Sequence, residues 1–139
     1  MSSYAIIIKK EGDRYFSYIK KVSSKQNPLF DALDEIRMGE RFSAHEISSN
    51  LEAIYCPDAS DYVDDMVTLT DADGEVLGQF CGDIVVIGKK NSGDRSRSQS
   101  IGLELHRAQD ILMSLHIDGK PAVPTPVRDN WISRRGVDN

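Results

Sequence analysis

The chain has 139 residues, of which 40% are hydrophobic and 28% are charged, and its formal net charge is −5. This composition is typical of a single globular domain and excludes wholesale disorder, which needs fewer apolar residues and a larger charge imbalance. No apolar run reaches the roughly 18 to 20 residues that span a bilayer, and residues 1–30 lack the pattern of a signal peptide. We therefore expect a cytoplasmic protein with no membrane partner.

The first predicted elements are a β-hairpin and a helix. Residues 4–10 are a β-branched run and residues 14–20 are rich in aromatic side chains, with a glycine-containing break between them. Asn27 then fits a helix N-cap, Pro28 a first helical residue and Gly39 a C-terminal stop. The apolar residues of this helix recur at helical spacing at Leu29, Phe30, Leu33 and Ile36.

A second helix is expected to begin at Ser43 and to end before Pro57. Ser43 and Glu46 have the spacing of a capping box. The apolar stripe of this helix consists of Ile47, Leu51, Ile54 and Tyr55. The stretch from Asp58 to Asp65 fits either a loop or a single helical turn, and the sequence leaves both open.

Three further strands are expected to form a meander. Residues 67–70 and 76–81 flank Asp73-Gly74, and a glycine after an aspartate supplies the positive φ that a tight hairpin turn requires. Gly82-Asp83 permits another reversal into the apolar residues 84–87. Residues 89–100 contain no hydrophobic side chain and predict a solvated loop.

The last predicted elements are a third helix and a tail. Residues 100–116 place Ile101, Leu105, Ala108, Leu112 and Leu115 on one helical face. Three prolines then favour an extended path for residues 120–139. Trp131 and Ile132 are expected to dock this tail on a single domain of residues 1–119, and an exposed Trp131 held for a partner is the alternative.

The predicted order ββααβββα separates two groups of strands with a pair of helices. It indicates an α+β fold, in which an antiparallel sheet of about five strands, a hairpin plus a three-strand meander, packs with about three helices. A parallel arrangement is disfavoured because the strands come in hairpin groups and do not alternate with helices.

The charges are distributed unevenly along the chain. Residues 42–88 contain ten acidic residues and no lysine or arginine, whereas residues 1–41 and 89–139 carry net charges of +2 and +3. A one-signed segment of this kind is either a solvated face that keeps the protein soluble or a surface that attracts a basic partner.

The residues that could support catalysis or metal binding form no recognisable constellation. Cys56 and Cys81 are too few for a disulfide scaffold, and the three histidines, His45, His106 and His116, have no metal-ligand spacing. The segment 71–75 (DADGE) places its glycine fourth, where a calcium loop needs it sixth, so it predicts a hairpin turn. We assign no catalytic residue, no metal and no cofactor from these residues.

Two segments resemble known families. The predicted helix of residues 27–38, followed by residues 43–47, resembles the first two helices of a helix-turn-helix or winged-helix domain, and the hairpin of residues 67–81 would be the wing. Duplex binding depends on cations that neutralise phosphates. Residues 42–88, which would provide the second helix and the wing, contain no lysine or arginine, so direct nucleic-acid binding is not expected. Residues 97–105 are similar to the pyrophosphate loop of the GNAT acetyltransferases, with Arg97 and Gly102 matching and Ser100 at the position of the first glycine. This resemblance implies acetyl-CoA binding at a helix N-terminus.

The sequence thus favours a small acidic interaction protein, an inhibitor or immunity-type factor that binds a basic and nucleic-acid-processing protein. Charged residues would steer the encounter and an aromatic residue would anchor it. The residues predicted to bind the partner are Asp58, Asp61, Tyr62, Asp64, Asp65, Asp71, Asp73 and Glu75. The alternatives are a GNAT-like acyltransferase that uses the loop from Arg97 to Gly102, and a structural subunit of a larger assembly. The sequence does not decide the oligomeric state.

Overall fold

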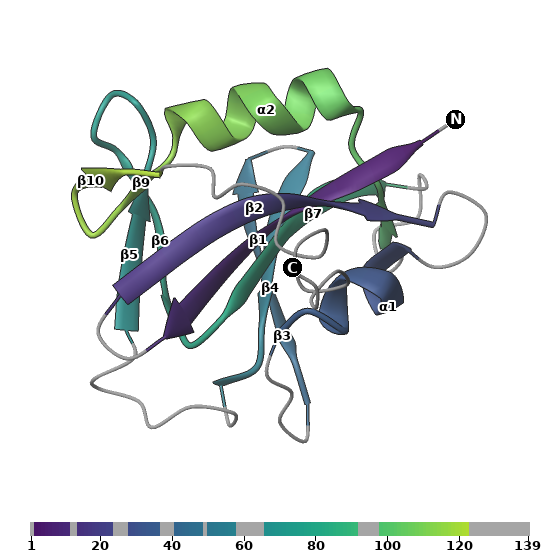
Figure 1. Cartoon of the computed structure of the whole chain (residues 1–139), viewed down its shortest axis with the longest axis horizontal. Helices are drawn as coiled ribbons and strands as arrows, with labels where there is room; N and C mark the ends of the chain where they lie inside the picture. Colours follow the sequence, from purple (N-terminus) through teal and green to yellow (C-terminus); the bar gives the residue numbers. More distant parts are fainter. Residues whose placement is uncertain are drawn as a thin grey trace, which may run out of the picture.

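The computed structural model describes residues 2–11, 14–23, 28–36, 41–48, 50–57, 66–91 and 98–122 of the chain. Its helices and strands follow one another along the chain as Figure 1 shows. They are β1 (Ser3–Glu11), β2 (Arg14–Val22), α1 (Pro28–Leu33), β3 (Ser43–Ser48), β4 (Leu51–Tyr55), β5 (Met66–Thr70), β6 (Val76–Cys81), β7 (Ile84–Asn91), β8 (Ser98–Ile101), α2 (Leu105–Ser114), β9 (His116–Ile117) and β10 (Lys120–Pro121). Neither helix is long and apolar enough to cross a membrane within these ranges.

The strands form two antiparallel sheets. Sheet A has the order β2-β1-β7-β4-β3, and β8 also pairs with β7. Sheet B has the order β10-β9-β5-β6. The two central strands of sheet A carry the apolar runs Ala5–Ile8 and Ile84–Ile87, whose side chains are fully buried. Continuous apolar runs are typical of strands covered on both faces, and sheet A is covered in this way.

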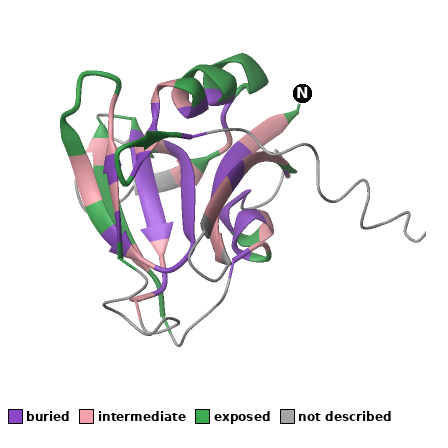
Figure 2. Ribbon diagram, turned by 60° about the vertical axis from the view of Figure 1, so that its left-hand side comes forward, coloured by how far each residue is buried: buried purple, intermediate pink, exposed green. Residues whose placement is uncertain are grey.

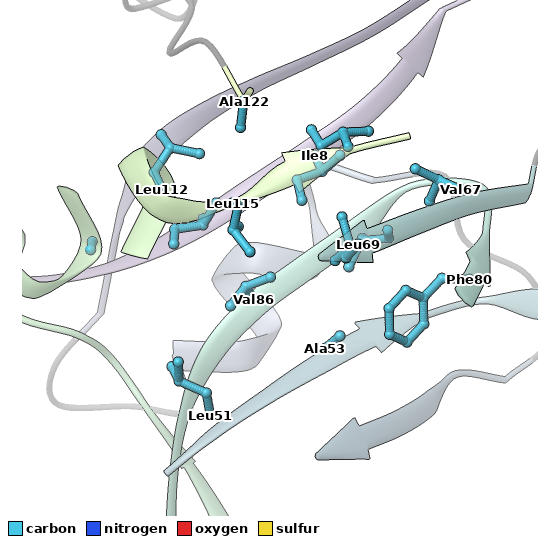
Figure 3. Packing of buried hydrophobic residues seen from close by; sticks show 14 of the residues in the cluster. Ile8, Leu51, Ala53, Val67, Leu69, Phe80, Val86, Leu112, Leu115 and Ala122 are labelled. Atoms are coloured by element: carbon cyan, nitrogen blue, oxygen red, sulfur yellow. The ribbon is translucent and has the colours of Figure 1, made fainter. Parts of the chain in front are cut away.

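One face of sheet A packs against sheet B and α2. Figure 3 shows Ile8, Val86 and Ala53 of sheet A converging with Leu69 and Phe80 of sheet B. The α2 side chains in this cluster are Ala108 and Leu112, and Leu115 follows directly after the helix. Burial of such side chains stabilises the fold by about 25 cal/mol per Å² of apolar surface.

The opposite face of sheet A packs against α1. Ile7 and Val85 from the central strands contact a cluster that includes Leu29 and Leu33 of this short helix. Because successive residues of a strand point to opposite faces, β1 and β7 supply both clusters with their alternating isoleucines and valines. In Figure 1, α1 and α2 lie on different sides of the strands.

The expected α+β fold with a five-stranded sheet and three helices is wrong, because the described chain is mostly β, with two sheets and two short helices. The predicted second helix is the β3–β4 hairpin. Its apolar stripe misled in part because Leu51 and Tyr55, four residues apart, share a face of β4 as they would share a face of a helix. Ile54 packs on the opposite face of sheet A. Glu46, the expected capping-box residue, lies in β3 opposite Glu52.

The expected three-strand meander is also wrong. β5 and β6 form the predicted hairpin, but β7 pairs with β1 and β4 in the other sheet. The reversal at Gly82, whose φ is 78°, therefore carries the chain from sheet B to sheet A. The fully apolar residues 84–87 need cover on both faces, which the edge of a meander would not provide.

Several other elements agree with the sequence in kind and differ in extent. The hairpin of β1 and β2 is confirmed, and α1 begins at Pro28 as predicted. The expected loop of residues 89–100 is partly strand, because β7 continues to Asn91 and β8 begins at Ser98. The third helix therefore begins only at Leu105. Trp131 and Ile132 of the predicted tail lie outside the described residues.

A hydrogen-bonded carboxylate ties the segment after α1 to β2. Glu35 accepts a 2.5 Å hydrogen bond from the Tyr18 hydroxyl and a 2.8 Å ion pair from the Lys20 ammonium group. Burial alone would raise the pKa of Glu35, but the bonds from Lys20 and Tyr18 outweigh it and hold that pKa below its ordinary value of 4.5. The contact thus stabilises the folded chain while Glu35 is ionised.

Replacement of Glu35 by glutamine should lower the free energy of unfolding at neutral pH by about 1 kcal/mol, because the pair is partly exposed. A lowered folded pKa gives stabilisation that is present above the unfolded pKa and is lost as pH falls through the folded value. Urea unfolding at neutral pH and near pH 3 tests this, and the difference from wild type should shrink at the lower pH. Glu104→Gln, whose side chain makes no capping bond, is the control. An equal loss at both pH values would contradict the prediction.

Candidate partner-binding surface

The described residues include three of the eight side chains predicted to bind a partner. Asp71, Asp73 and Glu75 lie together in the turn between β5 and β6. The other five, Asp58, Asp61, Tyr62, Asp64 and Asp65, lie outside the described residues. We call Asp71, Asp73 and Glu75 the acidic turn.

The acidic turn is held by its own first residue. The Asp71 carboxylate accepts hydrogen bonds from the backbone N–H groups of Asp73 (2.9 Å) and Glu75 (3.0 Å). The Asp71 N–H also donates to the Glu75 carbonyl (2.9 Å), and Gly74 adopts a φ of 88°. Aspartate and glycine are the residues that such a turn requires. Asp71 therefore has a structural role, whereas the side chains of Asp73 and Glu75 are exposed.

The hairpin that carries the acidic turn is anchored by buried side chains. Val67, Leu69 and Phe80 of the hairpin are buried in the core between the sheets. Figure 2 shows exposed residues at the turn of the β5–β6 hairpin, and residues of mixed burial along its two strands. Beside the turn, Val76 leaves 64% of its surface exposed. These buried side chains hold the hairpin against the core, and Asp71 holds the turn that carries the two exposed carboxylates.

The other described carboxylates of the acidic segment do not join this surface. Glu46 forms a 2.8 Å ion pair with Lys89 of β7. Glu52 and Asp83 are buried, and Asp83 accepts a 2.9 Å hydrogen bond from the Lys10 N–H. These three carboxylates are buried or paired within the protein. The charge counted along residues 42–88 therefore overstated the negative charge that is exposed at the surface.

Lys89 pairs with one of two like charges that lie opposite each other in sheet A. Glu46 lies directly opposite Glu52 in the β3–β4 register, and like charges in that position repel. The hydrogen bond to Glu46 raises the pKa of Lys89, and the charge of Glu52 adds to this effect. The Ser100 hydroxyl lies 3.4 Å from the Glu52 carboxylate and donates to it. The basic residue that follows the acidic segment therefore neutralises part of it.

Strand β5 places Met66 and the acidic turn at its two ends. Met66 begins β5 and Thr70 ends it, next to the acidic turn. At about 3.3 Å per residue, the two ends of this strand are more than about 10 Å apart. Met66, the first described residue after Asp65, thus lies at the end of sheet B opposite the turn.

The histidines and cysteines lie apart in the described ranges. No group of three or more His, Cys, Asp or Glu side chains there could hold a metal ion. His45 is in β3, His106 forms a 3.2 Å contact with Asp110 in α2, and His116 is in β9. Neither Cys56 nor Cys81 is in a disulfide, and the Cys81 thiol lies 3.8 Å from the Pro57 carbonyl.

The segment that resembles a pyrophosphate loop has a structural use for its glycine. A Cβ atom at Gly102 would collide with the side chain of Ser3. Residues 98–101 form strand β8, and α2 begins three residues after Gly102. Arg97 lies outside the described residues. Close packing explains Gly102, and the acyltransferase and structural-subunit readings stay predictions.

Comparisons of the chain with protein-family models, with curated proteins and with solved structures found no match.

Sequence reasoning missed the exposed Val76 and the pairing of Glu46 with Lys89. The exposure of Val76 follows from its position next to the turn in a strand with one face open to water. The ion pair between Glu46 and Lys89 depends on the strand order β7-β4-β3 in sheet A. No local pattern in the sequence indicates that order.

Replacement of Lys89 by methionine should destabilise the fold, because Glu46 and Glu52 would then face each other without a cation. Chemical unfolding at neutral pH measures the loss. Adding Glu46→Gln to the Lys89 variant should restore part of the lost stability, because Glu52 then faces no second carboxylate. Equal stabilities for the single and the double variant would show that Lys89 does not serve this pair.

Proposed function

We propose that this chain is an interaction protein that binds a basic protein partner through the acidic turn. The observation that supports this most directly is the exposure of the Asp73 and Glu75 side chains at a turn fixed by Asp71. In the described part of the chain, neither Asp73 nor Glu75 has an ion-pair partner. Glu46, by contrast, is neutralised internally.

The chemistry of the acidic turn favours lysine and arginine side chains as its counterpart. Exposed carboxylates attract a basic surface over roughly one Debye length, about 10 Å at 0.1 M salt, and so raise the association rate. Val76 adds an apolar contact beside the charges, which resembles the arrangement of a charged rim next to an apolar centre in other interfaces.

The more specific form of the proposal is an inhibitor of a nucleic-acid-processing protein. Proteins that bind nucleic acid present clefts lined by cations that neutralise phosphates. A protruding turn with carboxylates could occupy such a cleft in place of the phosphates. This form predicts that a nucleic acid and this chain compete for the same basic partner.

Removing the two free charges of the acidic turn should weaken binding of a lysine-rich peptide. Exposed charge pairs each contribute about 0.2 to 1 kcal/mol, so Asp73→Asn with Glu75→Gln should weaken binding about twofold to thirtyfold at low salt. NMR titration of the backbone amides in the turn measures this. The effect should disappear between about 0.01 M and 1 M salt, where the Debye length falls from about 30 Å to 3 Å.

The matched control is Glu104→Gln with Asp110→Asn, which changes the net charge equally at exposed positions on and before α2. It should leave the affinity of the peptide unchanged. If both double variants weaken binding alike, the attraction follows net charge and the acidic turn is not the binding site.

A further inference from the structure

We propose that the basic partner of the acidic turn binds as an added β-strand along the free edge of β6. This inference rests on the proposed function and specifies how that partner binds. β6 is an edge strand of sheet B, and among the described residues no strand pairs with it on the side away from β5. An edge strand of this kind can pair with an extended peptide.

The hydrogen bonds of Thr68 show which β6 groups face outward. The Thr68 N–H donates to the Asp118 carboxylate, and its carbonyl accepts from the Asp118 N–H, each at 2.9 Å. The backbone N–H and C=O of Thr68 therefore point toward β9. Because the direction of these backbone groups alternates along an antiparallel strand, those of Val67 and Leu69 point toward β6.

The register then assigns the free groups. Val67 lies opposite Phe80 and Leu69 opposite Gly78, so the backbone groups of Phe80 and Gly78 point toward β5. Those of Gln79, between them, point away from β5. Gln79 is exposed, and its side chain donates to the Thr68 hydroxyl (3.2 Å) across the outer face. Within the described ranges no strand pairs with the outward N–H and C=O of Gln79, so both groups can bond to an added strand.

The neighbouring strand β3 leaves this edge open. The rings of His45 and Phe80 meet edge to face at 5.6 Å, and Phe80 belongs to the core cluster between the sheets. β3 therefore lies on the inner side of β6, and an added strand would lie beside β6 in the plane of sheet B.

The charges near β6 favour a basic segment as the added strand, and they favour β6 over β3 as the strand it pairs with. Asp73 and Glu75 stand directly before Val76, so a strand paired with β6 would bring its residues close to both carboxylates. The other edge near this site, β3, has a register shift after Glu46, and its Glu46 is already paired with Lys89. A basic extended segment therefore fits β6 better than β3.

The test uses a peptide of alternating lysine and valine and the full chain. Gln79→Pro removes the outward N–H and should weaken binding about fivefold to tenfold, in line with the loss of one or two backbone hydrogen bonds. Proline is tolerated on an edge strand when its missing N–H faces outward. Gln79→Ala loses the same side-chain bond to Thr68 but keeps the N–H, so it should bind like the wild type.

Two measurements on the wild-type protein avoid any doubt about folding of the proline variant. Amide exchange at Gln79 should slow about tenfold when the peptide saturates the protein, as expected for one new backbone bond. A peptide methylated on alternate backbone nitrogens should not bind. Unchanged exchange, together with equal binding of the methylated peptide, overturns strand addition.

The outcomes separate the two proposals. If Asp73→Asn with Glu75→Gln weakens binding while Gln79→Pro does not, the acidic turn binds a basic partner without strand addition. If Gln79→Pro weakens binding and the charge variant does not, the peptide pairs with β6 independently of the turn. If neither weakens binding, both proposals are wrong.

Discussion

The structure depends on covering both faces of the central strands of sheet A. β1 and β7 bring continuous runs of isoleucine, valine and alanine into the middle of the molecule, and neither face of these runs can meet water without a large cost. Sheet B and α2 cover one face, and α1 covers the other. The β5–β6 hairpin is fixed to the rest of the protein through this requirement, because Val67, Leu69 and Phe80 complete the cover. The position of the acidic turn is therefore a consequence of core packing.

Local patterns predicted the elements that rest on local chemistry. The turn at Asp73-Gly74 is set by glycine's freedom at positive φ, and α1 begins where Pro28 fits a helix start. The β3–β4 hairpin could not be predicted in the same way. Residues 51–54 are buried on both faces, so the alternation that identifies a strand is absent. The order of the strands in sheet A depends on contacts distant in sequence and leaves no local signal.

In the candidate site, too, only the features that depend on neighbouring residues in the sequence could be predicted. The acidic turn was predicted because a tight turn and its charges are adjacent in sequence. The structural roles of Glu46, Glu52 and Asp83 could not be predicted, since their partners Lys89, Ser100 and Lys10 come from other strands. Charge counted along a chain thus measures composition, whereas the charge that a partner meets depends on which strands become neighbours.

The late position of β7 in the chain also affects how the protein is made. During synthesis from the N-terminus, the β1–β2 hairpin emerges long before its neighbour β7, with which Ile6, Ile7 and Ile8 pair. Until β7 leaves the ribosome, this edge of β1 lacks its hydrogen-bonding neighbour. Contacts between such distant segments slow folding because a long loop must close first. A nascent chain that stalls after its fourth strand would therefore expose an apolar strand edge to chaperones or to other nascent chains.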